Sequence, residues 1–177
     1  MKSSNRLRSS VLVLAALLGA AGQARAQGRR VLIHMKTGFD VDDAQICVVP
    51  NLAWAFLKAG DRVTILVDAS AVTAVARGYG ALNRLLGRRG TAMDRARLPA
   101  RERRSMAEQM GVPLAEVPHD YGEYLDFLKK KGVEIDGNRT MMLLFGIDPA
   151  KAAPAVTPVT LERMTELFTS ADTVVDY

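Results

Sequence analysis

The feature that most constrains this chain is a pair of short apolar runs joined by a long uncharged segment. Residues 31–35 (VLIHM) and 62–67 (RVTILV) are rich in aliphatic and β-branched side chains, which is typical of buried strands. Residues 43–59 between them read as a helix that Gly60 ends, and Pro50 predicts a kink inside it. Strand, helix and strand in this order form a βαβ unit, which requires a parallel sheet with a right-handed crossover. We therefore predict an α/β fold.

The rest of the chain continues the alternation of helices and strands. Further helices are expected over residues 69–77, 100–110, 121–131 and 161–170, and further strands over 132–135 and 173–177. Residues 136–138 (Asp-Gly-Asn) read as a loop after the third strand. Residues 27–177 have the length of a single domain that can bury a core without a disulfide or metal.

The first 26 residues have the composition of a secretory signal peptide. A cationic start precedes an apolar run at 11–21, and Ala24-Arg25-Ala26 provides small residues for cleavage before Gln27. A transmembrane helix needs about 20 apolar residues, so this run is too short to span a bilayer. We expect a signal peptide at 1–26, cleavage near Ala26/Gln27, and a periplasmic or secreted domain at 27–177 without a membrane span. An uncleaved anchor is the alternative.

The net charge of +5 and the pI of about 9.6 would suggest nucleic acid or an anionic membrane as a partner. Four of the 24 basic residues lie in the leader, however, and the leader contains no acidic residue. The domain that remains is nearly neutral, so we expect no nucleic-acid partner. The exception is residues 84–104, where eight arginines face only Asp94 and Glu102. We expect a solvated surface there, with an acidic protein partner for Arg84–Arg104 as the alternative.

Several segments together resemble the DsrE/DsrF-like family of small α/β proteins. They are the strand VLIHM, residues 51–72 (NLAWAFLKAGDRVTILVDASAV), residues 125–135 (LDFLKKKGVEI) and residues 161–177. Residues 84–118 match poorly and read as an arginine-rich insertion. The resemblance implies a three-layer α/β/α fold with flavodoxin-like layering, a mostly parallel sheet of about five strands, and assembly into trimers or hexamers.

The resemblance also implies where sulfur chemistry would occur, and this chain departs from the family there. Family members that relay persulfide sulfur have a cysteine just after the third strand, whereas residues 136–140 contain none. Cys47 is the only cysteine. Its apolar neighbours predict a buried thiol with a raised pKa, which is unreactive. In the alternative, the positive end of the helix dipole lowers the pKa of Cys47 and makes it a persulfide carrier.

The loops that follow the strands are the expected place for a ligand, because open parallel sheets bind ligands beyond the carboxyl ends of their strands. Three loops qualify, at 36–43, 68–72 and 136–140. The candidate ligand-binding residues are Lys36, Asp40, Asp42, Asp43, Asp68 and Asn138. In the alternative, the aspartates cap the following helix and Asp136-Gly137 makes a turn.

A metal site is not expected. The chain has two histidines, His34 and His119, and neither has a partner at metal-ligand spacing. His34 and Met35 point to opposite faces of a strand, so they do not share one ion easily. We expect no cofactor, and His34 to be satisfied at the strand end.

These observations lead to two hypotheses of function. The first is an exported, DsrE-like, non-catalytic binding or accessory subunit with a link to sulfur metabolism. It would be a homo-oligomer, because residues 44–57 carry no charge and so predict that a second subunit covers the outer side of this helix. The alternative is a sulfur carrier, or sulfurtransferase, that holds a persulfide on Cys47.

Overall fold

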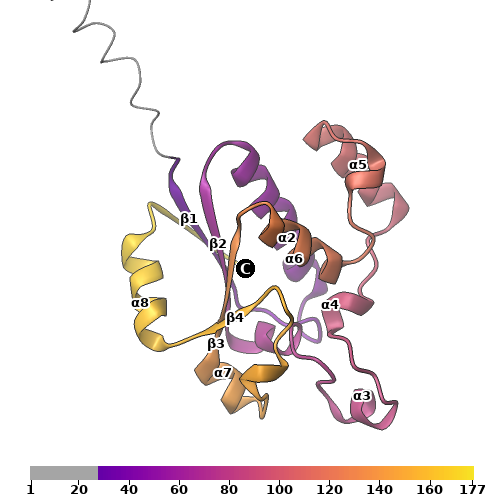
Figure 1. The fold of residues 1–177 in the computed structure, drawn as a ribbon, viewed down its shortest axis with the longest axis vertical. Coiled ribbons are helices and arrows are strands. Elements are labelled where there is room, and N and C mark those ends of the chain that lie inside the picture. The colour runs from indigo at the N-terminus through magenta and orange to yellow at the C-terminus, as the bar shows by residue number, and fades with distance from the viewer. Residues whose placement is uncertain (1–27) are drawn as a thin grey trace, which may run out of the picture.

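The computed structural model describes residues 28–177, which form a five-stranded sheet with helices on both faces (Figure 1). The strand order is β4-β3-β2-β1-β5, and all four pairings are parallel. The strands are β1 (Arg30–Met35), β2 (Arg62–Val67), β3 (Glu134–Asn138), β4 (Thr157–Val159) and β5 (Thr173–Asp176). The signal peptide expected at 1–26 lies outside the described residues.

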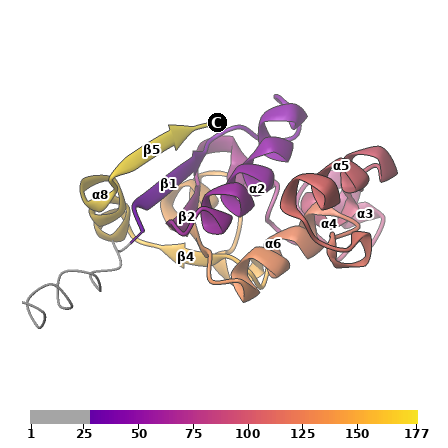
Figure 2. The ribbon, with the colours of Figure 1, turned by 90° about the horizontal axis from the view of Figure 1, so that it is seen from above.

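The helices form two layers around the sheet, so the predicted three-layer α/β/α architecture is confirmed. Figure 2 shows α2 and α6 on one side of the sheet and α8 on the other. The helices are α2 (Asp43–Lys58), α3 (Ala81–Leu85), α4 (Ala92–Arg95), α5 (Ala100–Met110), α6 (Tyr121–Lys130), α7 (Arg139–Leu144) and α8 (Leu161–Ser170). Short 3-10 helices cover Ala69–Thr73, Leu114–Glu116 and Pro149–Lys151.

Helix α2 follows β1 directly and begins at an aspartate cap. The Asp42 carboxylate accepts hydrogen bonds from the backbone N–H groups of Ala44 and Gln45, which the first turn leaves without partners. All residues from Asp43 to Lys58, including Pro50, belong to one continuous helix. Gly60 follows it with a backbone φ of 92°, which glycine adopts readily. The βαβ unit predicted from the sequence is therefore present.

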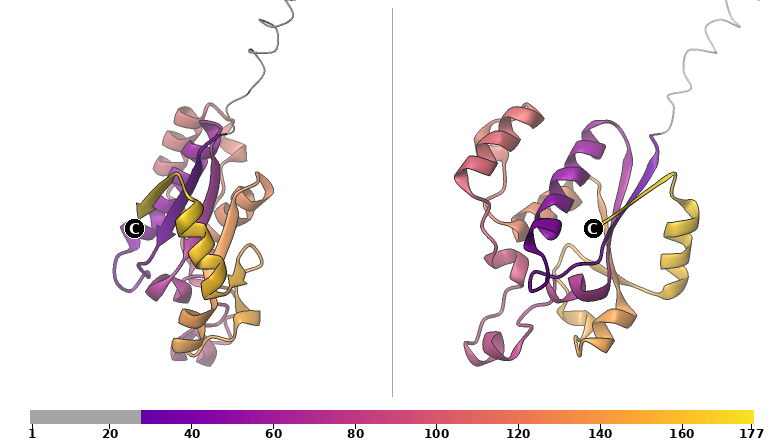
Figure 3. Two further views of the ribbon diagram at one scale, coloured as in Figure 1. Left: turned by 90° about the vertical axis from the view of Figure 1, so that its left-hand side faces the viewer. Right: turned by 180° about the vertical axis from the view of Figure 1, so that it is seen from behind.

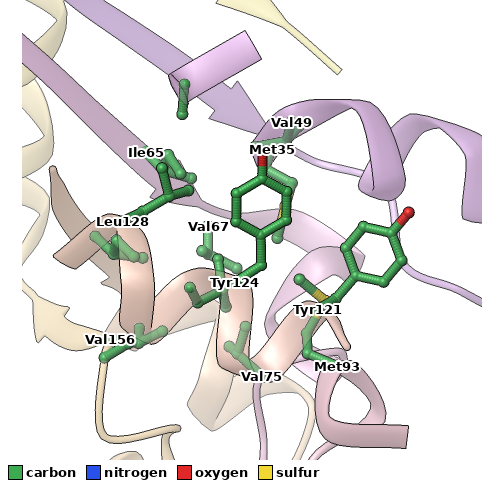
Figure 4. Packing of buried hydrophobic residues seen from close by; sticks show 14 of the residues in the cluster. Met35, Val49, Ile65, Val67, Val75, Met93, Tyr121, Tyr124, Leu128 and Val156 are labelled. Atoms are coloured by element: carbon green, nitrogen blue, oxygen red, sulfur yellow. The ribbon is translucent and has the colours of Figure 1, made fainter. Parts of the chain in front are cut away.

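Most of the core lies on the α2 and α6 face of the sheet. Val31, Ile33 and Met35 of β1 point to this face, where they join side chains from α2, α6 and β2. Figure 4 shows Tyr124 of α6 standing among these buried side chains, and its ring packs edge-on against Trp54 at 5.9 Å between centroids. The α8 face has a much smaller buried cluster, made of Leu32, Leu66, Met164 and Leu167.

The third strand is longer than predicted, and this corrects the reading of residues 136–138 as a loop. They lie within β3, where Asp136, Gly137 and Asn138 pair with β4. A Cβ on Gly137 would lie 2.7 Å from Met142 Cε and 2.9 Å from Val156 Cγ1. Close packing, and not a turn, therefore requires a glycine at position 137. For this reason the Asp136-Gly137 dipeptide, which is typical of turns, led to the wrong prediction of a loop.

The arginine-rich segment folds beside α2 and α6, with α3, α4 and α5 grouped on one side of them (Figure 2). Helix α5 buries Met106 and Ala107 against the main core. Two contacts tie α5 to α2: Asn51 Nδ2 donates to Glu102 at 3.3 Å, and Lys58 Nζ donates to the Met110 carbonyl at 2.8 Å. Helix α5 therefore covers part of α2, the helix for which the sequence predicted cover by a second subunit.

Candidate functional site

A polar network occupies the carboxyl ends of four neighbouring strands on the α8 side of the sheet. His34 of β1 is its centre. His34 Nε2 lies 3.0 Å from Asp68 Oδ2, and Nδ1 lies 2.9 Å from Asp176 Oδ1. Asn138 at the end of β3 donates from Nδ2 to Asp68 Oδ1 at 2.7 Å, and Lys36 Nζ lies 3.0 Å from Asp176 Oδ1. The topology brings these residues together because parallel strands end at one edge.

The His34 ring is held by carboxylates on both sides. A neutral imidazole has one N–H, so only the doubly protonated ring can donate to Asp68 and Asp176 at once. The side chain is 12% exposed, and Phe168 of α8 packs edge-on against the ring at 5.0 Å between centroids. The strand-end carboxylates and helix α8 therefore together fix the position of the His34 ring.

The charges in the network stabilise the ionised aspartates. The hydrogen bond from His34 lowers the pKa of Asp68, and the Ala69 N–H and Asn138 contribute further. The ion pair with Lys36 lowers the pKa of Asp176, with His34 as the next favourable contact. Asn138 also accepts from the N–H groups of Thr140 and Met141, and so caps α7.

The structure brings together some of the candidate ligand-binding residues and separates others. Lys36, Asp68 and Asn138 are all members of the network. Asp42 caps α2, while Asp43 lies in the first turn of that helix and Asp40 in the exposed turn before it. Within residues 28–177, no side-chain hydrogen bond or ion pair joins Asp40 or Asp43 to this network.

From the sequence we predicted that His34 lies at a strand end. The sequence did not reveal that His34 is the centre of the polar network or that Asp176 is a member of it. The alternation of side chains along the strand could have indicated the position of His34. His34 follows Leu32 by two residues, so both lie on the α8 face of the sheet and not on the face of the larger core. Asp176 pairs with His34 across β1 and β5, and this register could not be deduced before the strand order was known.

Cys47 lies on the other side of the sheet, packed against the main core. Burial raises the pKa of its thiol, a hydrogen bond with Tyr121 partly opposes this, and the carboxylates of Glu102 and Asp43 raise it further. Tyr121 also donates to Glu102 Oε1 at 3.2 Å. These surroundings disfavour a thiolate.

A second charged group lies on the α8 face. Arg163 of α8 reaches Glu134 Oε2 at 2.9 Å and Asp136 Oδ2 at 3.3 Å. Burial raises the pKa of Asp136, although the hydrogen bond from Arg163 opposes this. The pKa of Asp136 is therefore raised, whereas the pKa of Asp68 is lowered by its partners.

Neither a metal-ligand cluster nor a membrane-spanning helix occurs in the described part of the chain. Within residues 28–177, no group of three or more His, Cys, Asp or Glu side chains is arranged to hold a metal ion. In the same part of the chain, no helix has the length and apolar character that crossing a membrane requires.

Comparisons with known proteins support the fold. No protein-family model matches the chain, and no curated protein matches its sequence. Among solved structures, the chain is similar to the ychN protein from E. coli, a DsrE-like fold, with a TM-score of 0.51 and 17% sequence identity. The match covers 85% of this chain and 99% of the ychN chain. At this identity the likeness shows the fold alone.

Proposed function

We propose that this chain is an exported, DsrE-like accessory subunit that acts by binding rather than by catalysis. In this proposal it works as a homo-oligomer and has a link to sulfur metabolism. One observation carries the proposal: the α8 face of the sheet has a single covering helix and exposes a set of large apolar side chains.

The exposed apolar residues come from α8, from β5 and from the α7 segment at the carboxyl end of the sheet. Figure 3 shows α8 in front of the sheet with α7 near its end. The exposed set comprises Leu143, Leu144, Phe145, Leu161, Phe168 and Val174, of which Leu144 is 73% exposed. We take these side chains to form one apolar surface, which is typical of protein–protein contacts. A second copy of the chain is the proposed occupant, which replaces the earlier interpretation that α2 provides the interface.

The strand-end network supports binding better than catalysis. His34 and Asp68 have most of their polar atoms engaged with one another, with Asn138 and with Asp176. Lys36 and Asp176 are the half-exposed members, at 44% and 55% of their side-chain surface. A ligand would therefore meet this ion pair first. Asp40 and Asp43 would contribute only from the turn before α2 and from its first turn.

The alternative function is a sulfur carrier with a persulfide on Cys47. The Tyr121 hydroxyl beside Cys47 is the feature in its favour, because it lowers the pKa of the thiol. Burial is the larger effect and acts in the opposite direction. Titration of the folded protein with a thiol reagent discriminates the two functions. Reaction of Cys47 only after denaturation supports the binding subunit, and fast reaction in the native state supports the carrier.

Light scattering tests the oligomer. We expect the unmutated protein to be an oligomer at micromolar concentration, and Leu144→Glu to dissociate it by placing a charge in the interface. Leu85→Glu is a matched control, since Leu85 on α3 is 82% exposed but lies outside the α8 face. A stable monomer of the unmutated protein, or equal effects of both variants, would contradict the proposal.

A further inference from the structure

A concave pocket of about 480 Å³ lies at the end of the molecule where Figure 1 shows α3 and α7. It is separate from the strand-end network, with which it shares no lining residue. Five basic side chains and one acidic side chain contribute to its lining, namely Arg77, Arg84, Arg88, Arg89, Lys151 and Asp148. No motif in the sequence predicted this cavity, because its walls come from two distant segments, 76–89 and 146–151.

Backbone hydrogen bonds fix the walls of the pocket relative to one another. The Arg77 N–H donates to the Lys151 carbonyl at 2.9 Å, and Arg77 Nη2 donates to the Ala150 carbonyl at 2.7 Å. The Gly78 N–H donates to the Gly90 carbonyl at 3.2 Å and so attaches the loop that carries Arg88 and Arg89. A Cβ on Gly78 would lie 3.2 Å from the Arg88 carbonyl oxygen, which shows how closely the two segments pack. Arg77 is part of this frame, and the other four basic side chains line the pocket around it.

The positive charge in the pocket has little compensation from the protein. Within residues 28–177, none of the five basic side chains lies within 4.0 Å of a carboxylate oxygen, and Asp148 uses Oδ1 to accept from the Ala150 N–H. Like charges that converge on one concavity repel one another, and a multiply charged anion would relieve this repulsion.

Two of the remaining arginines of residues 84–104 make contacts within the protein. Arg95 Nη1 donates to the Gly90 carbonyl at 2.7 Å, and Arg103 is bonded to the carbonyls of Val117 and Pro118. The arginine-rich segment is therefore divided between internal contacts, the pocket and exposed sites such as Arg101 and Arg104. This division favours a compact ligand over an acidic protein that would need the whole segment.

We propose that the pocket binds a small organic anion that carries two or more phosphate or carboxylate groups. Guanidinium groups suit these ligands because they form paired, charge-assisted hydrogen bonds with planar or tetrahedral oxyanions. The cavity has the size of a small-molecule site, and Tyr79 and Ile147 add an aromatic and an aliphatic wall for the organic part.

Isothermal titration calorimetry with pyrophosphate and with citrate tests the proposal and distinguishes phosphate from carboxylate ligands. We expect one of the two to bind with one-to-one stoichiometry at moderate ionic strength. Arg88→Gln/Arg89→Gln should weaken binding about tenfold or more, since each removes a charge-assisted hydrogen bond. Lys151→Gln, on the opposite wall, should also weaken binding. Arg101→Gln/Arg104→Gln removes the same charge from exposed sites on α5 and should leave affinity nearly unchanged.

Three results would overturn the proposal. The first is that neither probe binds at millimolar concentration. The second is an equal loss in both double variants, since this would show only the general effect of net charge. The third is a hexaglutamate peptide that binds more tightly than either probe, which would make the surface a docking site for acidic protein segments. Circular dichroism of each variant confirms that it is folded before its affinity is compared.

Discussion

The two faces of the sheet differ in what they bury. On the α2 and α6 face, aliphatic side chains of β1 and β2 meet a continuous apolar layer that includes the buried ring of Tyr124. On the α8 face, the buried apolar cluster within residues 28–177 consists of Leu32, Leu66, Met164 and Leu167, and charged groups lie directly beside it. Both faces belong to the same strands, so the difference arises from alternate residues.

Because of this difference, we expect one face to contribute mainly to stability and the other to function. The apolar face provides most of the hydrophobic stabilisation, because burial contributes in proportion to the apolar area removed from water. The α8 face retains the network around His34, the Arg163 group and the exposed side chains of α7 and α8. Function is therefore expected where stabilisation by the core is smaller.

The largest effect should come from the apolar face. Leu128→Ala removes a fully buried side chain from α6 and should lower the free energy of unfolding by about 2–5 kcal/mol. Leu167→Ala on α8 should cost less, because this smaller cluster borders solvent and can relax around the lost atoms. Urea denaturation of both variants measures the difference. Equal costs would show that the two faces contribute alike.

The next effect concerns His34. His34→Ala leaves Asp68 and Asp176 without their shared partner and should cost about 1–3 kcal/mol at neutral pH. The lowered pKa of Asp68 contributes stability above its unfolded value near 3.8, and this stability is lost as the pH falls through the lower folded value. Between pH 7 and pH 2, the free energy of unfolding should therefore decrease less in His34→Ala than in the unmutated protein.

His119 provides the control for this experiment, because it is the other histidine and is exposed. His119→Ala should leave both the stability and its acid dependence within about 0.5 kcal/mol of the unmutated protein. An unchanged acid dependence in His34→Ala would mean that the imidazole does not stabilise the ionised aspartates.

A smaller effect is expected within the arginine-rich segment. Arg103 is half-buried and donates to the carbonyls of Leu114, Val117 and Pro118, so Arg103→Gln should cost about 1–2 kcal/mol. Arg104 is exposed, and Arg104→Gln should cost less than about 0.5 kcal/mol. Thermal melts of the two variants test this. The sequence alone predicted a solvated surface for both arginines, since spacing does not show which arginine finds a carbonyl.

Local chemistry made much of the fold predictable. The βαβ unit, the helices over residues 100–110 and 161–170, and the cap by an aspartate before α2 all follow from periodicity and capping residues. The strand β4 was missed because it has three residues, one of them Pro158, and takes its identity from pairing with β3. The helix α7 is likewise short, and Asn138 begins it from the end of a strand.

The candidate site was predictable only in part, because it depends on strand order. Lys36, Asp68 and Asn138 follow strands and could be proposed from the rule for parallel sheets. Asp176 joins them because β5 lies next to β1, although the two strands are far apart in sequence. The anion pocket depends in the same way on the pairing of Arg77 with Lys151, which no local pattern encodes.

The smallest effect distinguishes two carboxylates on the α8 face. Burial raises the pKa of Asp136, so its ionised form destabilises the folded state at neutral pH relative to a neutral side chain. This cost is absent below the unfolded pKa and develops as the pH rises through the raised folded value. Asp136→Asn should therefore increase the free energy of unfolding at pH 7 by less than about 1 kcal/mol, with no gain near pH 3.

Arg163 keeps Glu134 and Glu166 as partners in the Asp136→Asn variant, at 2.9 and 3.5 Å, so the substitution does not isolate its charge. Glu134→Gln is the control, because this carboxylate is exposed and its ion pair should contribute under about 0.5 kcal/mol. Urea denaturation at both pH values measures the two variants. A loss of stability in Asp136→Asn at pH 7 would show that the bond to Arg163 outweighs burial. In that case Asp136 would behave like Asp68, and the α8 face would hold two stabilising charge groups instead of one.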